Sequence, residues 1–183
     1  MYNESLNPQI IYSLNSLSNS LFTLLEKHDI NELTVTEVCG EANVNRANFY
    51  RNCDNIIDLV YFKIDTLAKG LTKEIDWNSK DEVEMYTHFF SYWYAHKNIL
   101  TILNNQNLFD IFLLRYKKIS NEINHPFIND LITNNRDIKD IKMYFNSFNL
   151  GGLCDVLKCW AENKFVTPIN DIVKIICSLT PKY

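Results

Sequence analysis

Between Thr34 and Arg51 the chain carries side chains that suit contact with a nucleic acid. Guanidinium and hydroxyl groups donate hydrogen bonds to phosphate oxygens, and asparagine amides pair with the edge of adenine. We therefore predict a contact surface for double-stranded DNA made of Thr34, Thr36, Asn45, Arg46, Asn48, Tyr50 and Arg51. The alternative is that Arg46 and Arg51 are ordinary surface cations and that Tyr50 belongs to the core.

No comparable pattern indicates catalysis. The sequence has no H-E-x-x-H, no P-loop, no G-x-S-x-G and no Cys/His cluster with zinc spacing, and its acidic residues are scattered. We predict that the chain is not an enzyme and needs no cofactor or metal. Its five cysteines lack a C-x-x-C pair, which is typical of reduced buried thiols. No start resembling a signal peptide and no apolar run of about 18–20 residues is present, so we expect a cytoplasmic protein that does not engage a membrane.

Charge works against the DNA hypothesis. The whole chain has a formal net charge of −4, and residues 1–60 hold three basic and eight acidic side chains, a net of −5. DNA-binding domains are usually basic, because phosphate contacts supply much of their affinity. A second hypothesis is therefore kept, in which the protein has lost DNA binding and acts as a ligand- or protein-binding partner.

Local rules predict how the polar segment folds. Thr34 and Glu37 form a T-x-x-E capping box, which marks a helix start near Val35. Asn43 suits the left-handed conformation of a tight turn that ends a helix, and Asn45 can cap a second short helix. Two short helices joined by so tight a turn indicate a helix-turn-helix.

The remaining sequence predicts an all-α fold of about nine helices. Only four glycines and four prolines are present, and no proline occurs between Gln9 and His125, which favours long helices. We predict a three-helix helix-turn-helix domain over residues 1–54 and a second helical domain over residues 55–183. Apolar spacings of three and four and capping residues predict helices at Ile10–Lys27, Ile56–Leu71, Asp81–His96, Ile99–Leu103, Leu108–Ile123, Arg136–Glu162 and from Thr167-Pro168 onward.

These residues resemble the tetracycline-repressor (TetR) family of bacterial regulators. The matching run extends from Leu33 to Arg51 and ends in Ala47-Asn48-Phe49-Tyr50-Arg51, with the Phe49-Tyr50 pair at the family's distance from Ala42-Asn43-Val44. Three positions depart from the pattern. Asn43 replaces a turn glycine, Cys53 replaces a phenylalanine, and Ile56 stands where the family commonly has a phosphate-contacting lysine. Farther on, Gly151-Gly152, Trp160–Asn163 and Thr167-Pro168 resemble the branch of dihydroxyacetone-kinase operon regulators.

The resemblance implies an operator-binding homodimer whose helical body encloses a small-molecule effector. The rings spaced to line the inner faces of two helices are Tyr86, Phe90, Trp93, Phe109, Phe112 and Tyr116. An apolar pocket with such walls suits an apolar or aromatic ligand, although simple core packing is an equal alternative for each ring.

The last two helices are expected to pair with those of a second chain as a four-helix bundle. The predicted interface residues are Phe145, Phe148, Gly151, Gly152, Ile169, Ile172, Val173 and Ile176. Each glycine inside a helix costs about 1 kcal/mol relative to alanine, and close approach at a two-fold interface would compensate. The alternative is a local kink. The resemblance therefore implies that residues 55–183 form a ligand-binding and dimerisation domain and that the protein is a repressor that an effector releases from DNA.

Overall fold

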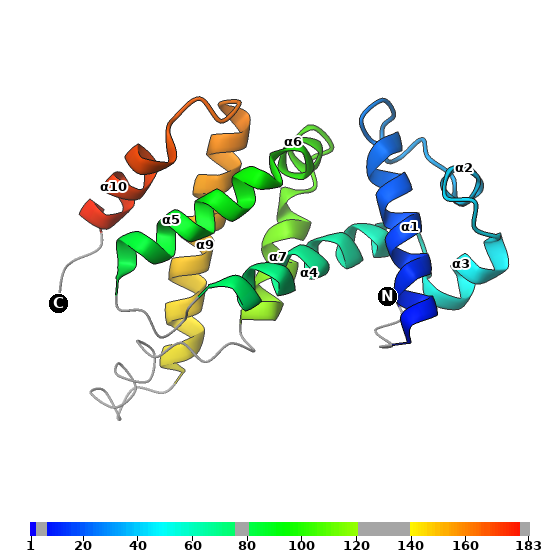
Figure 1. Cartoon of the computed structure of the whole chain (residues 1–183), viewed down its shortest axis with the longest axis horizontal. Helices are drawn as coiled ribbons and strands as arrows, with labels where there is room; N and C mark the ends of the chain where they lie inside the picture. Colours follow the sequence, from blue (N-terminus) through cyan, green and yellow to red (C-terminus); the bar gives the residue numbers. More distant parts are fainter. Residues whose placement is uncertain (3–6, 76–80, 121–139, 180–183) are drawn as a thin grey trace.

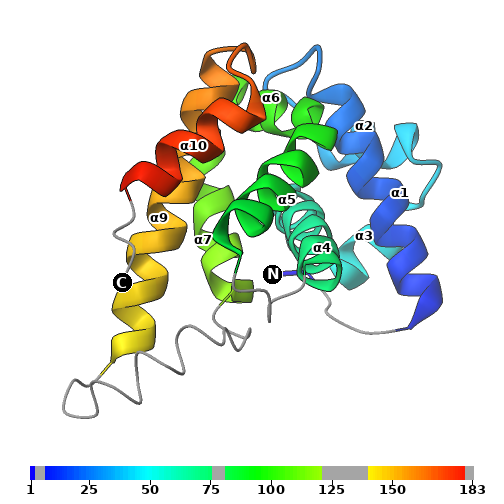
Figure 2. The same ribbon diagram turned by 60° about the vertical axis from the view of Figure 1, so that its left-hand side comes forward.

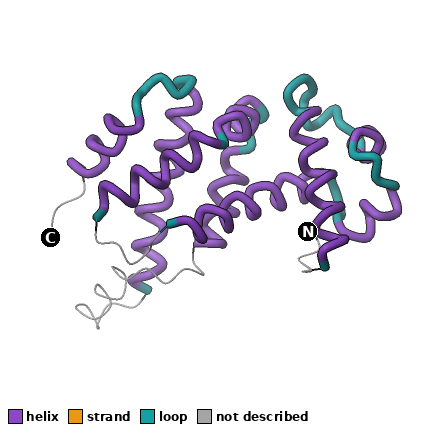
Figure 3. The backbone as a smooth tube through the Cα atoms, in the orientation of Figure 1, coloured by secondary structure: helices purple, strands orange, loops and turns teal. Residues whose placement is uncertain are grey.

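The computed structural model describes residues 1–2, 7–75, 81–120 and 140–179 of the 183-residue chain. Within these ranges the regular structure consists of nine α-helices, and no strand occurs there (Figure 3). The predicted all-α class is confirmed. The helices are α1 (Pro8–Leu24), α2 (Val35–Glu41), α3 (Arg46–Asn52), α4 (Ile57–Glu74), α5 (Glu82–Ala95), α6 (Lys97–Asn105), α7 (Phe109–Ser120), α9 (Ile141–Glu162) and α10 (Ile169–Leu179).

Several helix ends differ from the sequence prediction. Helix α1 ends at Leu24 rather than Lys27, because the amides of Lys27 and His28 both turn back to the Leu24 carbonyl at 3.0 Å. Helix α6 is longer than predicted at both ends. The predicted break at His125-Pro126, the end of the helix expected to reach Ile123 and the helix start expected at Arg136 lie outside the described residues.

Short polar side chains explain where several helices begin. The Asn7 side chain accepts from the Gln9 amide at 2.9 Å, and Pro8 occupies the first helical position, where no amide hydrogen is needed. Asp81 caps α5 by accepting from two amides of the first turn. Asn55 accepts from the Ile57 amide at 2.9 Å, so it serves the start of α4 as predicted, one residue before the cap position.

The helices form an N-terminal group and a larger body. Figure 1 shows α1, α2 and α3 together at one end, with α4 running from this group into the body. There α4 packs against α7, α7 and α6 pack against α9, and α10 lies along α5, as Figure 2 shows from the side. Among the described helices, none combines the length and apolar character that a membrane crossing requires.

Candidate nucleic-acid interface and sensing body

The turn between α2 and α3 has the predicted geometry. Thr34 and Glu37 form both bonds of the capping box at the start of α2. Asn43 adopts φ 51°, and the amides of Asn43 and Val44 donate back to Gly40 and Cys39 at 3.2 and 3.0 Å. This left-handed turn caps the carbonyl end of α2 and sends the chain directly into α3. The predicted helix-turn-helix is therefore present.

Helix α3 presents two of the predicted contact residues together. Asn45 caps it by accepting from the Asn48 amide at 2.7 Å. Arg46 is exposed, and its guanidinium carbon lies 5.9 Å from the centroid of the Tyr50 ring. The Tyr50 side chain is 53% exposed, whereas its neighbour Phe49 is fully buried. The alternative that Tyr50 belongs to the core is wrong, because Phe49 fills that place.

Two other predicted contact residues bond neighbouring side chains of the protein through their own side chains. The side-chain amide of Asn48 donates to the Ser13 hydroxyl at 3.0 Å, and this bond ties α3 to α1. The side-chain oxygen of Asn48 accepts from the side-chain amide of Asn52 at 3.0 Å. The Thr34 hydroxyl donates to the Glu37 carboxylate at 2.7 Å, and these bonds lower the pKa of Glu37. Thr36 and Arg51, the two remaining residues of the predicted contact surface, are exposed. The sequence predicted the capping box at Thr34, but it did not predict that Asn48 bonds Ser13 on another helix.

Local charge at α3 differs from that of the whole N-terminal region. Helix α3 contains Arg46 and Arg51 and no acidic residue. At least four of the eight acidic side chains in residues 1–60 have local structural roles. The Asp29 carboxylate accepts from the Asn31 backbone amide at 2.8 Å, and Asp54 pairs with the amino terminus. Glu37 completes the capping box, and Asp58 is buried and accepts from the Asp54 amide at 2.8 Å. Part of the acidity thus holds the fold together, and α3 itself is cationic.

The two family departures at the end of the motif are both inward-facing. Cys53 is buried, and burial raises the pKa of its thiol to about 12. Ile56 is half-buried and packs against the core. Neither residue offers a contact to phosphate, so the positive charges of this region are those of α3.

A buried ion pair links α4 to α7 behind the motif. Arg115 bonds Asp65 through two guanidinium nitrogens, and both side chains are almost fully buried. The Tyr2 hydroxyl also donates to Asp65, and the Tyr61 ring lies 5.1 Å from the guanidinium carbon. Sequence reasoning missed this cluster, because its members lie far apart in the chain.

The six rings predicted to line an effector site are all buried. Phe112 lies at its centre, with ring centroids 4.8 Å from Trp93, 5.5 Å from Phe109 and 5.9 Å from Tyr116. Phe90 joins them through Phe89. The rings of α5 and α7 thus contact one another in a cluster that comprises Phe90, Trp93, Phe109, Phe112 and Tyr116. Whether they also bind a ligand remains a prediction.

One polar atom in this ring cluster has no partner. The indole nitrogen of Trp93 is fully buried and makes no hydrogen bond. Trp160, also buried, donates to the Thr167 carbonyl at 2.9 Å. A buried donor without an acceptor costs about 1–3 kcal/mol, so Trp93 marks a point where a bound acceptor atom would be stabilising.

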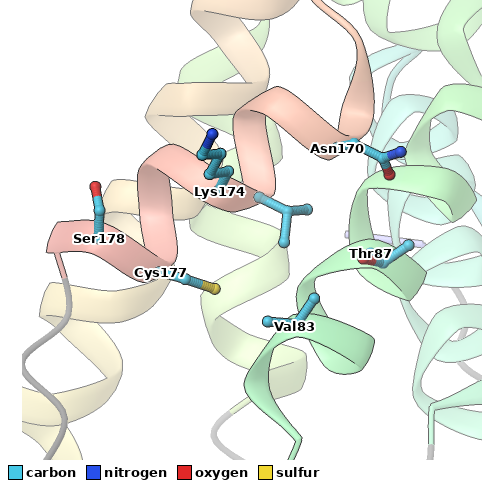
Figure 4. Close-up of a pocket in the computed structure, with 7 residues that line it drawn as sticks. Val83, Thr87, Asn170, Lys174, Cys177 and Ser178 are labelled. Atoms are coloured by element: carbon cyan, nitrogen blue, oxygen red, sulfur yellow. The ribbon is translucent and has the colours of Figure 1, made fainter.

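A pocket of about 410 Å³ lies between α5 and α10. Figure 4 shows Val83 and Thr87 projecting from α5 toward α10, and Cys177 projecting from α10 toward Val83. Nearby, burial raises the pKa of Tyr86 to about 12. Sequence reasoning missed most of these residues, since only Val173 was singled out. The pocket is lined by Val83, Thr87, Asn170, Val173, Lys174, Cys177 and Ser178.

The predicted dimer residues divide between the surface and the core. Phe148 is 80% exposed, and an added Cβ at Gly151 or Gly152 would meet nothing within 4 Å. Ile172 and Val173, by contrast, are buried within the protomer, where α10 packs on α5. These two side chains lie on the face of α10 that turns toward its own chain, and their place in an interface between two copies stays a prediction.

Other apolar side chains are exposed on the last two helices. Ile175 and Leu179 project from α10, and Met143 and Tyr144 precede Phe148 on α9. The spacing of four between Tyr144 and Phe148, and between Ile175 and Leu179, places each pair on one helix face. Three further predicted interface residues, Phe145, Ile169 and Ile176, are half-buried.

Comparison with known proteins finds the same fold in transcription regulators. A TetR transcriptional regulator from Streptococcus agalactiae 2603V superposes with a TM-score of 0.66 and 20% identity, over 95% of this chain and 96% of that chain. The fatty acid degradation regulator FadR from Bacillus halodurans gives a TM-score of 0.61 and 13% identity, over 96% of both chains. The dihydroxyacetone kinase operon activator DhaS gives 0.57 and 12%, over 91% of this chain and 93% of that chain.

These similarities establish the fold over almost the whole chain. No protein-family model matches the sequence. No curated protein matches it at a significant level. The predicted tetracycline-repressor architecture is confirmed as a fold, including its likeness to a dihydroxyacetone-kinase operon regulator. The three similar structures are those of transcription regulators, and the likeness to them shows the fold of this chain.

Proposed function

We propose that this protein is a one-component transcription regulator that binds operator DNA through α3. The observation that carries the proposal is the exposed, cationic surface of α3, where Arg46, Tyr50 and Arg51 project beyond the capped turn from α2. A second helix held in this way by the first is the geometry that enters a major groove. Such a role places the protein in the cytoplasm.

The regulator is proposed to act as a homodimer. Operator recognition by a helix-turn-helix requires two motifs about one helical turn of DNA apart. The exposed apolar side chains of α9 and α10, with the open backbone at Gly151 and Gly152, suit a four-helix bundle between two copies.

The regulator is proposed to be a repressor released by a small apolar or aromatic effector. Two places in the body suit such a molecule. The ring cluster offers aromatic walls and the unpartnered Trp93 donor, and the pocket between α5 and α10 offers an apolar floor at Val83 and Val173. In the first case the rings must separate to admit the ligand.

The experiment is selection of duplexes from a random library on the purified protein, followed by an electrophoretic shift with the selected sequence. The account expects a two-fold symmetric site, retarded at low salt, and release of the DNA by compounds extracted from the protein's own host cells. Failure to enrich any sequence at low salt would contradict operator binding.

The second candidate is a partner protein that has lost DNA binding. It is favoured by the net charge of −5 over residues 1–60 and by Ile56 in place of a basic residue. This candidate predicts that no duplex is enriched, while a small molecule or a protein still binds the purified chain. Mass spectrometry of a ligand co-purified with the protein distinguishes the small molecule from the protein partner.

A further inference from the structure

The side chain of Gln106 connects the body to the N-terminal helices by three hydrogen bonds. Its amide nitrogen donates to the Leu25 carbonyl at 3.1 Å and to the His28 carbonyl at 2.9 Å. Its oxygen accepts from the Ile30 amide at 3.0 Å. These partners lie 76 to 81 residues earlier in the chain, in the loop between α1 and α2.

The three bonds satisfy backbone groups that the end of α1 leaves open. A helix leaves its last carbonyls without intrahelical partners, and the Leu25 and His28 carbonyls belong to the turns that follow α1. Leu25 and Ile30 are themselves buried and Gln106 is half-buried, whereas His28 is exposed, so the bonds lie at the edge of the core. A primary amide is the side chain that supplies two hydrogens and one acceptor at a single point.

The position of Gln106 is fixed by its own helix. Gln106 is the cap residue of α6, and Asn107 follows with φ 56°. The Asn107 and Leu108 amides donate back to Asn104 and Leu103 at 3.1 and 2.7 Å. This closed turn makes the corner between α6 and α7 stiff, so a movement of the corner carries the Gln106 amide with it.

The same corner leads directly into the ring cluster. Phe109, three residues after Gln106, begins α7 and lies 5.5 Å from Phe112. At its other end α6 is joined to α5, the helix that carries Trp93. His96 is both the last cap of α5 and the first cap of α6. A change in the packing of these rings therefore has a short covalent path to Gln106.

We propose that Gln106 is a positioning residue, which sets the helix-turn-helix group relative to the body and transmits movements of the α6–α7 corner to it. The transmission of movement to DNA binding rests on the proposed function, whereas the positioning of the N-terminal helices does not. The bonds themselves exist in the free protein, so the positioning role is testable without DNA. By thermodynamic reciprocity, DNA bound at α3 must also alter the α6–α7 corner if the two are coupled.

The test is hydrogen exchange on the full chain, free and with the selected duplex, in wild type, Gln106→Ala and Gln106→Glu. In Gln106→Ala the Ile30 amide should exchange about tenfold faster or more, because it loses its acceptor. Gln106→Glu keeps an acceptor for Ile30 but has no hydrogens for the two carbonyls. The matched controls are Asn105→Ala and Asn105→Asp, which change the exposed neighbouring residue in the same ways.

In wild type, adding DNA should change exchange in α7, and both Gln106 variants should lose that change while the controls keep it. A merely structural role would speed Ile30 exchange and leave the effect of DNA on α7 intact, which would overturn the coupling. Unchanged Ile30 exchange in Gln106→Ala would overturn the positioning role. Should wild type bind no duplex, the proposed function fails, and the free-protein comparison alone decides whether Gln106 holds the N-terminal helices.

Discussion

At the scale of single residues, two buried tryptophans differ in one hydrogen bond. Trp160 donates to the Thr167 carbonyl, and Trp93 has no acceptor. Both are buried among aromatic rings, so replacement by phenylalanine removes a similar volume from each site. The pair therefore isolates the energetic consequence of an indole donor with and without a partner.

We expect Trp160→Phe to lower the free energy of unfolding by about 1 kcal/mol more than Trp93→Phe, because only the first loses a hydrogen bond. Urea denaturation of the two variants measures the difference. Equal losses would mean that Trp93 has an acceptor in solution, such as a buried water molecule.

Residue-level rules predicted the backbone better than the side chains. The capping box at Thr34, the left-handed turn at Asn43 and the cap at Asn45 depend on neighbours within three residues, so the sequence contains what determines them. The direction of Asn48 depends on Ser13 on another helix. The bonds of Gln106 likewise depend on packing, which no local pattern encodes.

At the scale of helices, Gly70 on α4 makes room for the hydroxyl group of Tyr92 from α5. A Cβ added at Gly70 would lie 2.5 Å from the Tyr92 hydroxyl oxygen, which donates to the Leu67 carbonyl at 2.7 Å. A Cβ at Gly40 on α2 would meet nothing within 4 Å. An added methyl group would therefore be crowded at Gly70 and free of contacts at Gly40.

Gly70→Ala should lower the free energy of unfolding by about 1–3 kcal/mol through overpacking. Gly40→Ala should raise it by about 0.5–1 kcal/mol through helix propensity. Thermal or urea denaturation measures both, and adding Tyr92→Phe to Gly70→Ala should restore part of the loss. Stabilisation by Gly70→Ala would show that the Tyr92 hydroxyl is not held at this distance from Gly70.

Apolar periodicity predicted where the helices are, but it predicted only in part which face of each helix is buried. The apolar residues of α10 recur on more than one face, so the sequence did not show that Ile172 and Val173 face α5 while Ile175 and Leu179 face outward. Which face meets the protomer's own core is decided by the shape of α5 and α9. Periodicity thus predicted the helices that hold the expected interface residues, but not which faces of these helices the protomer itself covers.

At the scale of the whole molecule, the outward face of α9 and α10 predicts the oligomeric state. Phe148→Asp places a charge in the proposed interface and should convert a dimer into a monomer at micromolar concentration, since an unpaired charge is costly to bury. Sedimentation velocity measures the change. The control is Tyr12→Asp, where the native side chain is 78% exposed on α1, a helix that lies apart from α9 in Figures 1 and 2. A wild-type monomer, or a Phe148→Asp dimer, would contradict this interface.

The central claim is that α3 binds DNA through its own positive charges despite the acidic region around it. The most direct measurement is the affinity for the selected duplex at several salt concentrations, in wild type, Arg46→Ala and Lys27→Ala. A dimer that loses one phosphate contact per protomer should bind more weakly, with a slope of log affinity against log salt smaller by about two. Lys27→Ala, an exposed cation beyond the end of α1, should keep the wild-type slope. Unchanged affinity and slope in Arg46→Ala would contradict the account.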